Sequence, residues 1–445
     1  MKTYLTARLK QVFEQSRSDA FHGIFSLMRT ATTYSLNARF VFPIDRPPIR
    51  DGWITVSDGR IDTIGNRPVG ERHELGNVAI LPAFVNAHTH LEFSNLDQPL
   101  GRSGMRFTDW IREVVRWRRE ASDRNSGIDW RYDAIRCGIA ESLRCGTAMF
   151  GEIATLPRSE GDGRYDAMQG VCFLELLGLA DERHDELLAA AKTHLATSRS
   201  GGAALSLGLS PHAPYTVSQR LVESVASLAA RDRVPVAMHL AETQEELELL
   251  RSGSGPFQEL LAELGAWHAN VIPQGSTPLD YLKILAKAHR SLIVHGNYLT
   301  REEIEFAGQQ RDRMSVIYCP RTHAYFDHER YPLHQMIRCG VNVALGTDSR
   351  ASNPDLNMLN EFRFAAQQHE DIPLATILRL ATINGALALG VERSHGTLAP
   401  EKRADLVVIP VAEDDPNDPH ELLLATTGHI RMLFRNGQQV FPEIN

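Results

Sequence analysis

The sequence predicts an α/β protein, in which a (β/α)8 TIM-like barrel is accompanied by a small β-sandwich domain formed by both chain ends. Three observations predict this fold. Eight short apolar runs alternate with helical segments in the middle of the chain, β-rich runs with turn signals occupy both ends, and helix-start signals lie just past predicted strands. Alternating strands and helices are typical of a parallel sheet covered by helices, and eight such units close into a barrel.

The two ends of the chain carry the signals of short antiparallel strands. Runs at 38–43, 52–56 and 60–64 alternate apolar and polar residues around the turn dipeptide Asp58-Gly59, and runs at 405–410 and 432–441 resemble them near the C-terminus. We therefore predict four segments: an N-terminal extension (1–33), the first part of the small β domain (34–79), the barrel (80–396) and the second part of the small β domain (397–445).

The extension has no apolar signal core and carries Glu14 and Asp19, which argues against a secretory or transit peptide. Two interpretations stay open. In the first, Met28 is the true start and the residues before it are not part of the natural protein. In the second, the apolar residues of the extension form a short helix that packs against the rest of the chain.

The middle of the chain contains eight apolar runs, one for each strand of the predicted barrel. The apolar runs lie at 80–86, 147–153, 171–177, 205–210, 234–240, 291–295, 314–319 and 341–346. Capping-box patterns at Thr216–Gln219, Thr243–Glu246 and Thr300–Glu303 predict helices that begin soon after the fourth, fifth and sixth runs.

Composition excludes several function classes. The formal net charge of −8 provides no overall basic field, so we expect a small-molecule partner and no nucleic acid. The longest apolar runs are about ten residues, too short for a membrane span of about 20. The five cysteines are odd in number and form no CxxC pair, which favours a reducing, cytoplasmic compartment without a disulfide framework.

Polar residues close four of the predicted barrel strands, at the end where barrel enzymes place their chemistry. The first strand ends in His88-Thr-His90, whose two side chains share one face because residues two apart on a strand point the same way. Neutral imidazoles on one face suit a divalent metal such as zinc, although surface HxH pairs are also common. His239 and Glu242 follow the fifth strand, His295 the sixth and Asp348 the eighth. Because four separate strands each end in such a residue, we interpret the set as a functional site and not as polar residues that are merely hydrogen-bonded in the core.

This set, HxH, HxxE, HG and GTDS, resembles the amidohydrolase superfamily. It is similar above all to the branch of methylthioadenosine/S-adenosylhomocysteine deaminases, aminofutalosine deaminases and triazine hydrolases. The resemblance runs from about Ala38 to the C-terminus and includes LPAFVNAHTHLEF, SPHAPYT, GTDSRASN and GTLAPEKRADLVV.

The resemblance implies roles for the matching residues. His88, His90, His239 and Asp348 would bind one divalent metal, with zinc as the default and iron or manganese as alternatives. Glu242 would carry protons between water and substrate, Asp348 would also accept a proton, and His295 would hydrogen-bond the reacting centre. Binuclear relatives use a carboxylated lysine on the fourth strand, and residues 196–230 contain no lysine. A single-metal site is therefore expected.

Four further residues are candidates for substrate contact. His212 in SPHAPYT matches a histidine that the family places against the substrate, although a turn residue between two prolines is the plainer interpretation. Glu92 in HLEFS resembles aminofutalosine deaminases, and Arg102 and Arg106 in the same loop would meet an anionic group unless they are simply solvated.

Two segments depart from the family pattern. Where relatives read HCPxSN after strand seven, this chain has Tyr318-Cys-Pro-Arg-Thr-His323, and Arg350 stands where an apolar residue is expected. The metal set is unaffected, but the name of the substrate is not settled.

The resemblance implies a mononuclear metal-dependent aminohydrolase that deaminates a purine nucleoside-like or other aminated N-heterocycle and releases ammonia. One alternative is hydrolysis of another ring substituent or of a cyclic amide, as in chlorohydrolases and imidazolonepropionases. A non-catalytic scaffold is disfavoured, because every ligand and both proton-handling residues are present. Relatives with this fold often form homodimers.

Overall fold

The computed structural model describes residues 33–124, 129–157, 163–197, 205–268, 271–424 and 429–442. Apart from Thr33, the predicted extension and both interpretations of it lie outside these residues.

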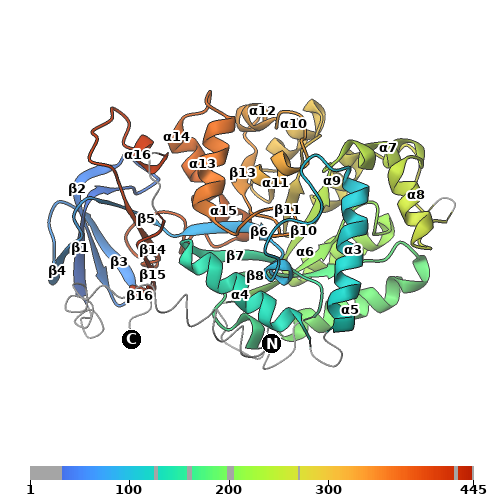
Figure 1. Ribbon diagram of the computed structural model, residues 1–445, viewed down its shortest axis with the longest axis horizontal. Helices are drawn as coiled ribbons and strands as arrows, with labels where there is room; N and C mark the ends of the chain where they lie inside the picture. Colours follow the sequence, from blue (N-terminus) through green and yellow to red (C-terminus); the bar gives the residue numbers. More distant parts are fainter. Residues whose placement is uncertain are drawn as a thin grey trace.

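Eight parallel strands form the barrel, each hydrogen-bonded to the next in chain order (Figure 1). A parallel bridge between Thr89 and Asp348 brings the last strand back to the first. The strands are β6 (Phe84–Thr89), β7 (Thr147–Ala154), β8 (Gly170–Leu176), β9 (Leu205–Pro211), β10 (Pro235–Leu240), β11 (Arg290–His295), β12 (Met314–Tyr318) and β13 (Asn342–Leu345). The predicted barrel is confirmed, and the C-terminal ends of its strands gather the candidate residues.

Helices connect these strands and surround the barrel (Figure 1). They are α3 (Phe107–Arg124), α4 (Arg131–Arg144), α5 (His184–Ala196), α6 (Gln219–Asp232), α7 (Gln244–Ser252), α8 (Pro256–Glu263), α9 (Pro278–Leu285), α10 (Arg301–Gln309), α11 (Pro320–Tyr325), α12 (Leu333–Arg338), α13 (Met358–Gln368), α14 (Leu374–Leu380), α15 (Ile383–Leu389) and α16 (Glu421–Leu424). Short 3-10 turns are η1 (Leu91–Phe93), η2 (Gly163–Tyr165) and η3 (Asp181–Arg183).

Both chain ends contribute to a second, mixed sheet beside the barrel, in the order β16-β15-β14-β5-β1-β2-β3, with β4 paired to β1. Its strands are β1 (Thr33–Val41), β2 (Ile49–Ser57), β3 (Arg60–Gly65), β4 (Glu71–Glu74), β5 (Val78–Pro82), β14 (Leu406–Pro410), β15 (Met432–Arg435) and β16 (Gln438–Phe441). Buried residues from both ends, among them Leu36, Ile54, Leu406 and Phe434, share one apolar core. The predicted meeting of the two ends is therefore confirmed.

Two local predictions were wrong. The run 80–86 is not one strand: β5 pairs with β1 and β14 in the small sheet, and β6 begins in the barrel after Ala83. The apolar pattern cannot mark this change, because both strands are fully buried. Helix α6 is capped by Ser218, whose hydroxyl accepts the Leu221 amide hydrogen, and not by Thr216.

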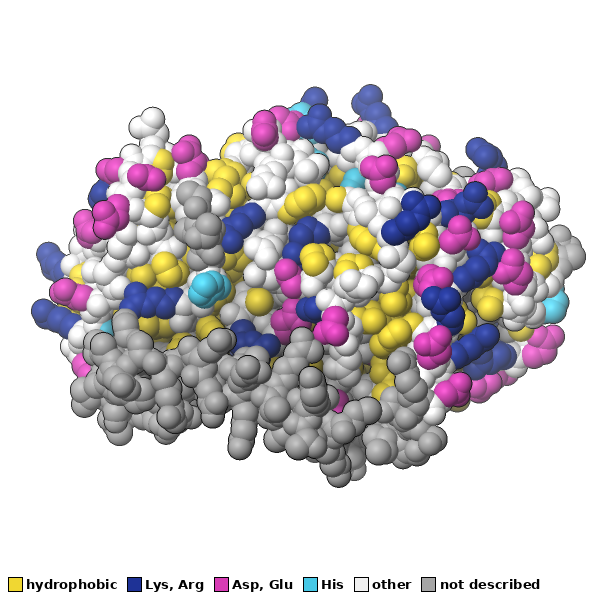
Figure 2. Space-filling model, in the orientation of Figure 1, with side chains coloured by type: hydrophobic (Ala, Val, Ile, Leu, Met, Phe, Trp, Pro, Cys, Tyr) yellow, Lys and Arg dark blue, Asp and Glu magenta, His cyan; other side chains and the backbone are white. Residues whose placement is uncertain are grey.

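Positive and negative side chains are interspersed over the face of the molecule in Figure 2. Among the described residues, no helix is both long and apolar enough to cross a membrane. The five cysteines are free.

Candidate active site

Three histidines from two strands converge at the mouth of the barrel. His88 and His90 lie at the end of β6, and His239 lies in β10. All three are buried, and one ring nitrogen from each lies within 4.8 Å of the others. The Nε2 atoms of His90 and His239 are 3.4 Å apart. This arrangement is consistent with the prediction that the three histidines lie close together.

Asp348 approaches this triad from the loop after β13. Its Oδ1 atom lies 3.4 Å from His88 Nε2 and 3.5 Å from His90 Nε2. The amides of Thr347 and Asp348 both donate to the His88 carbonyl, so the loop is joined to β6. Gly346 permits this approach, because a Cβ there would meet the His88 carbonyl oxygen at 2.9 Å. Burial by itself would raise the pKa of Asp348, but the nearby imidazoles of His88 and His90 bring it well below its ordinary value.

The donor set fits a divalent metal ion. His239 Nδ1 lies 3.1 Å from the His212 carbonyl oxygen, to which it donates, so its Nε2 lone pair faces the equivalent atom of His90. The Nε2 atom of His88 is buried without a hydrogen-bond partner among the described residues. A divalent cation placed among these nitrogens would accept the His239 lone pair and give the His88 nitrogen a partner. Three imidazoles and one carboxylate would fill four coordination positions and leave a fifth for water.

Glu242 and His295 form a second pair beside the histidines. His295 Nε2 lies 3.2 Å from Glu242 Oε1, and both side chains are almost fully buried. Burial raises the pKa of Glu242, and the negative charges of Asp348 and Glu246 add to that rise. Burial lowers the pKa of His295 to about 3. The pair is therefore a carboxyl that holds a proton readily beside a neutral imidazole.

The backbone that carries Glu242 is held by Glu246, one turn into α7. The Glu246 carboxylate accepts the amide hydrogens of Ala241 at 2.8 Å and Glu242 at 2.9 Å. Ala241 has a left-handed φ of 52°, so this turn is strained and needs such support. The capping-box pattern at Thr243–Glu246 predicted the helix start, but it did not reveal this support.

His212 lies at the rim of the site, after β9. Its Nδ1 atom is 2.7 Å from the Thr216 hydroxyl, and its ring lies 4.8 Å from the His239 ring. Thr216, expected to cap a helix, instead orients this imidazole. Burial lowers the pKa of His212 to about 3, with a further contribution from the charge of Arg118.

The other three predicted contacts lie elsewhere. Glu92 is buried and forms ion pairs with Arg118 and Arg131. Arg102 and Arg106 are exposed and are not among the described residues that line the cavity.

A cavity of about 440 Å³ opens onto this cluster. Its lining includes His90, His212, His239, Glu242, His295 and Asp348, together with aromatic and aliphatic side chains of α3 and α8. Two lining residues, Glu175 and Arg118, were missed by the sequence reasoning. Burial raises the pKa of Glu175 to about 7 against an opposing contribution from Arg118. Glu175 lies inside the predicted third strand, so the same inspection of strand ends could have found it.

The first departure from the family pattern forms an aromatic layer behind His295. Tyr318 and Tyr331 stack with ring centroids 3.8 Å apart and an interplanar angle of 13°. The Tyr331 hydroxyl donates to the His295 carbonyl oxygen at 2.9 Å. Since His295 has a left-handed φ of 68°, this hydrogen bond stabilises the backbone that presents it.

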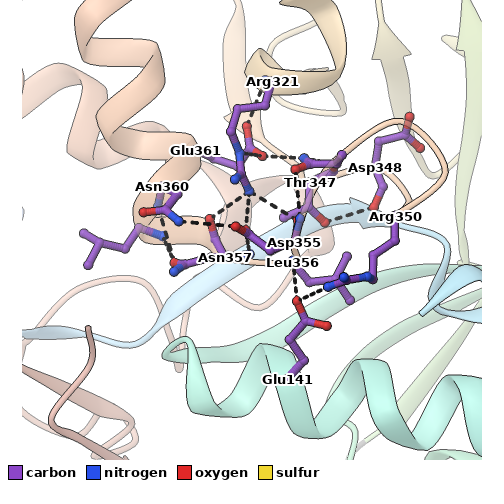
Figure 3. Close-up of polar contacts among 12 residues, drawn as sticks. Glu141, Arg321, Thr347, Asp348, Arg350, Asp355, Leu356, Asn357, Asn360 and Glu361 are labelled. Atoms are coloured by element: carbon purple, nitrogen blue, oxygen red, sulfur yellow. Dashed lines mark hydrogen bonds and ion pairs between the residues drawn. The ribbon is translucent and has the colours of Figure 1, made fainter. Parts of the chain in front are cut away.

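The second departure, Arg350, anchors the loop that carries Asp348 (Figure 3). Its guanidinium group donates to Glu141 of α4 at 2.8 Å and to the Leu96 carbonyl at 2.8 Å. Glu141 also accepts the Leu356 amide hydrogen at 3.0 Å. The charged residue is tolerated at this position because a carboxylate from a neighbouring helix pairs with it.

A further polar network supports Thr347 and Asp348 from the other side (Figure 3). Arg321 pairs with Glu361 at 2.7 Å, and Asn353 donates both to Glu361 and to the Thr347 carbonyl. The Ser352 hydroxyl donates to Asp348 Oδ2 at 2.9 Å, which leaves Oδ1 to face the histidines.

The fold is a (β/α)8 barrel, and the histidine-carboxylate cluster at its mouth could hold a divalent metal ion. The family model of the amidohydrolase family matches residues 79–440. The chain belongs to the amidohydrolase family, which confirms the resemblance described from the sequence.

The chain is similar to proteins named as deaminases. The chain is 29% identical over 401 residues to a 5-methylthioadenosine/S-adenosylhomocysteine deaminase from Moorella thermoacetica, with 85% of each chain covered. It is 31% identical over 348 residues to an aminodeoxyfutalosine deaminase from Deinococcus radiodurans, with 76% of this chain and 80% of that protein covered.

A solved structure shares both fold and length. An adenosine deaminase from Xanthomonas campestris with bound zinc matches with a TM-score of 0.71 and 25% identity, over 91% of this chain and 92% of that chain. Together with the family, the deaminase relatives confirm the prediction of a hydrolase that acts on carbon–nitrogen bonds.

Proposed function

We propose that this protein is a mononuclear metal-dependent aminohydrolase, which removes an exocyclic amino group from a purine nucleoside-like N-heterocycle and releases ammonia. The observation that carries the proposal is the Glu242–His295 pair beside the histidine triad, in the lining of a cavity of about 440 Å³. Deamination needs a proton donor next to an activated water, and this pair lies next to the metal-binding set.

His88, His90, His239 and Asp348 would hold one divalent ion. Zinc is the proposed metal, supported by the three imidazoles, by the single carboxylate and by the zinc in the similar Xanthomonas structure. Such an ion, when bound, lowers the pKa of a coordinated water and stabilises negative charge that develops on the substrate.

The chain's own residues move the protons. Glu242 takes a proton from the water at Oε1 and delivers it to the substrate ring nitrogen. Its raised pKa suits this task, because a carboxylate with a raised pKa takes up the water proton more readily and can then donate it to the substrate. The second water proton, taken up by Asp348, passes to the amino group, which departs as ammonia when the carbon–nitrogen bond breaks. His295 hydrogen-bonds the tetrahedral carbon's oxygen or the water, and Asp348 accepts the second water proton through Oδ2 or Oδ1.

The walls of the cavity accept a flat, largely apolar ligand. Phe107, Trp110 and Phe257 line it, and His212 offers Nε2 at its rim. This supports a small heterocyclic substrate. The free cysteines support the proposed cytoplasmic compartment. The homodimer stays a prediction, which light scattering would check.

The test is an ammonia-release assay on the zinc-loaded protein. The panel holds adenosine, methylthioadenosine, S-adenosylhomocysteine, aminofutalosine, guanine, cytosine and aminotriazines. Ammonia from one or more of the adenine nucleosides supports the proposal. Chloride release from chlorotriazines or ring opening of an imidazolone, without ammonia from any aminated ring, would replace it with the alternative hydrolase.

A further inference from the structure

A serine, a histidine and an aspartate form a hydrogen-bonded chain among the helices that surround the barrel. His184 and Asp185 are the first two residues of α5, and Ser224 lies in α6. The Ser224 hydroxyl oxygen lies 3.0 Å from His184 Nε2, and His184 Nδ1 lies 3.0 Å from Asp185 Oδ1. A hydroxyl, an imidazole and a carboxylate in this order are the arrangement that activates a serine as a nucleophile.

The Asp185 carboxylate determines which nitrogen of the His184 ring carries the hydrogen. The hydrogen bond to His184 lowers the pKa of Asp185, so this carboxylate is ionised and can only accept. In the neutral ring the hydrogen is therefore on Nδ1, and the lone pair of Nε2 accepts the hydrogen of the Ser224 hydroxyl. The His184 side chain is only 8% exposed, which holds the ring in this position. His184 can thus act as the base for Ser224.

A groove of about 530 Å³ between α5 and α6 makes Ser224 accessible to a small molecule. Leu188 of α5 and Leu228 of α6 line it beside the serine and provide an apolar surface. Its other lining residues are Lys192, Glu223, Ser227 and Arg231. The two cationic residues follow His184 and Ser224 by about two helical turns, whereas Glu223 directly precedes the serine. A short, uncharged acyl chain therefore suits the end of the groove where Ser224 lies.

The backbone around Ser224 limits the chemistry that this group can carry out. The residue lies inside a helix of 14 residues, where amide hydrogens are bonded to carbonyl oxygens four residues earlier. Such amides are not free to bind the oxyanion that forms when an ester carbonyl is attacked. Activated esters, whose leaving group departs easily, are therefore the expected acyl donors. Water meets the same limit when it attacks the acyl-serine, so the acyl group should remain on Ser224.

We propose that Ser224 is an acyl-accepting nucleophile, which takes short acyl groups from activated esters at a second reactive site outside the barrel. Ser224 Oγ attacks the ester carbonyl carbon while its proton passes to His184 Nε2. As the bond between the carbonyl carbon and the leaving oxygen breaks, His184 returns the proton to that oxygen, and the products are an acyl-serine and an alcohol. The inference is independent of the proposed function, because neither residue lines the cavity of the candidate active site.

The test incubates the full-length, zinc-loaded protein with 4-nitrophenyl acetate and follows acetylation by peptide mass spectrometry. The matched control is Ser227, which lines the same groove but whose hydroxyl donates to the Glu223 carbonyl oxygen at 2.8 Å. Both serines fall in one tryptic peptide, 221–231, so fragment ions assign the acetyl group. Ser224 should react at least about ten-fold faster than Ser227, because a general base contributes about 10²- to 10⁴-fold. His184→Gln should remove most of this difference, and Ser224→Ala should remove the adduct without a change in ammonia release.

Three results would overturn the inference. They are a wild type in which Ser224 is not acetylated, equal acetylation of Ser224 and Ser227, and a His184→Gln variant that reacts as fast as the wild type at an unchanged melting temperature. If His184→Gln fails to fold, Asp185→Ala replaces it, because the Asp185 side chain is 97% exposed. That variant should slow the acetylation of Ser224 and leave that of Ser227 unchanged, and an equal effect on both serines would also overturn the inference.

Discussion

At the scale of single residues, the site depends on how burial changes the proton affinity of each group. Burial raises the pKa of Glu242 and lowers that of His295. A carboxyl with increased proton affinity therefore lies next to an imidazole with decreased proton affinity. Neither tendency could be obtained from the residue types alone, because both depend on the surrounding walls.

Replacement of Glu242 by Gln keeps the shape and removes the titratable proton. We expect kcat to fall by about 10²- to 10⁴-fold, the range typical of a general acid–base, with zinc content unchanged. Glu245→Gln serves as the control, because that neighbouring carboxylate does not line the cavity. Metal analysis and steady-state kinetics on the two purified variants make the comparison. A fully active Glu242→Gln enzyme contradicts the proton-transfer role.

His323, in the unusual stretch after β12, should make stability depend on pH. Burial lowers its pKa to about 3, and neighbouring His328 lowers it further. In the unfolded chain the His323 imidazole has a pKa near 6.5, so it binds a proton at a higher pH than in the folded protein. The stability that neutral His323 contributes is therefore fully present above pH 6.5 and is lost as the pH falls toward 3. Between pH 7.5 and pH 5, the wild type should lose about 2 kcal/mol more free energy of unfolding than His323→Gln. Urea unfolding of both proteins at the two pH values measures this, and parallel losses would contradict it.

Several residues of the candidate site could be predicted from the sequence, since each proposed metal ligand lies close to the C-terminal end of a strand. Glu175 lies one residue before the end of β8, so inspection of strand ends could have found it, but the sequence does not show that its side chain lines a cavity. Arg102 and Arg106 were predicted from their loop, whereas Arg118 lines the cavity from α3. Sequence alone does not show which face of a helix points inward when arginines occur on all of its faces.

At the scale of elements, the loops after the strands are fixed by partners from distant parts of the chain. Arg350 reaches α4, and Tyr331 reaches the end of β11. The sequence marked both segments as departures from the family pattern. It could not show that the new side chains make new contacts, because those contacts join residues far apart in the chain.

The Tyr331 hydroxyl is expected to hold His295 in its strained conformation. Tyr331→Phe retains the ring stack and removes only the hydrogen bond to the His295 carbonyl. We expect kcat to fall about ten-fold with KM nearly unchanged, and stability to fall by about 1 kcal/mol. Tyr318→Phe, which keeps both the stack and that hydrogen bond, should retain kcat. If both variants behave alike in kinetic assays, the hydroxyl does not position His295.

At the scale of the whole molecule, the proposed metal ligands come from both sides of the point where the barrel closes. His88 lies on β6 and His90 directly follows it, Asp348 lies in the loop after β13, and a bridge between Thr89 and Asp348 joins the two segments. The strand order of this barrel was predictable from alternating apolar runs. The division of 80–86 between two sheets was not, because a fully buried run looks the same in either sheet.

Removal of the metal should therefore destabilise the whole barrel. An ion that binds only the folded chain adds about 2.7 kcal/mol at a free concentration one hundred times its Kd. Chelation should lower the melting temperature by a few degrees, and added zinc should restore it. His88→Asn should show neither response. An equal response of that variant in differential scanning fluorimetry would place the stabilising ion outside this site.

The central claim is that water replaces an amino group on a ring. The most direct measurement is mass spectrometry of the product formed from the best substrate of the panel in ¹⁸O-labelled water. The account predicts that one amino group is exchanged for one oxygen atom that carries the solvent label, with one equivalent of ammonia and the ring intact. A product that keeps its amino group, with the labelled oxygen at another ring position or in an opened ring, would contradict it.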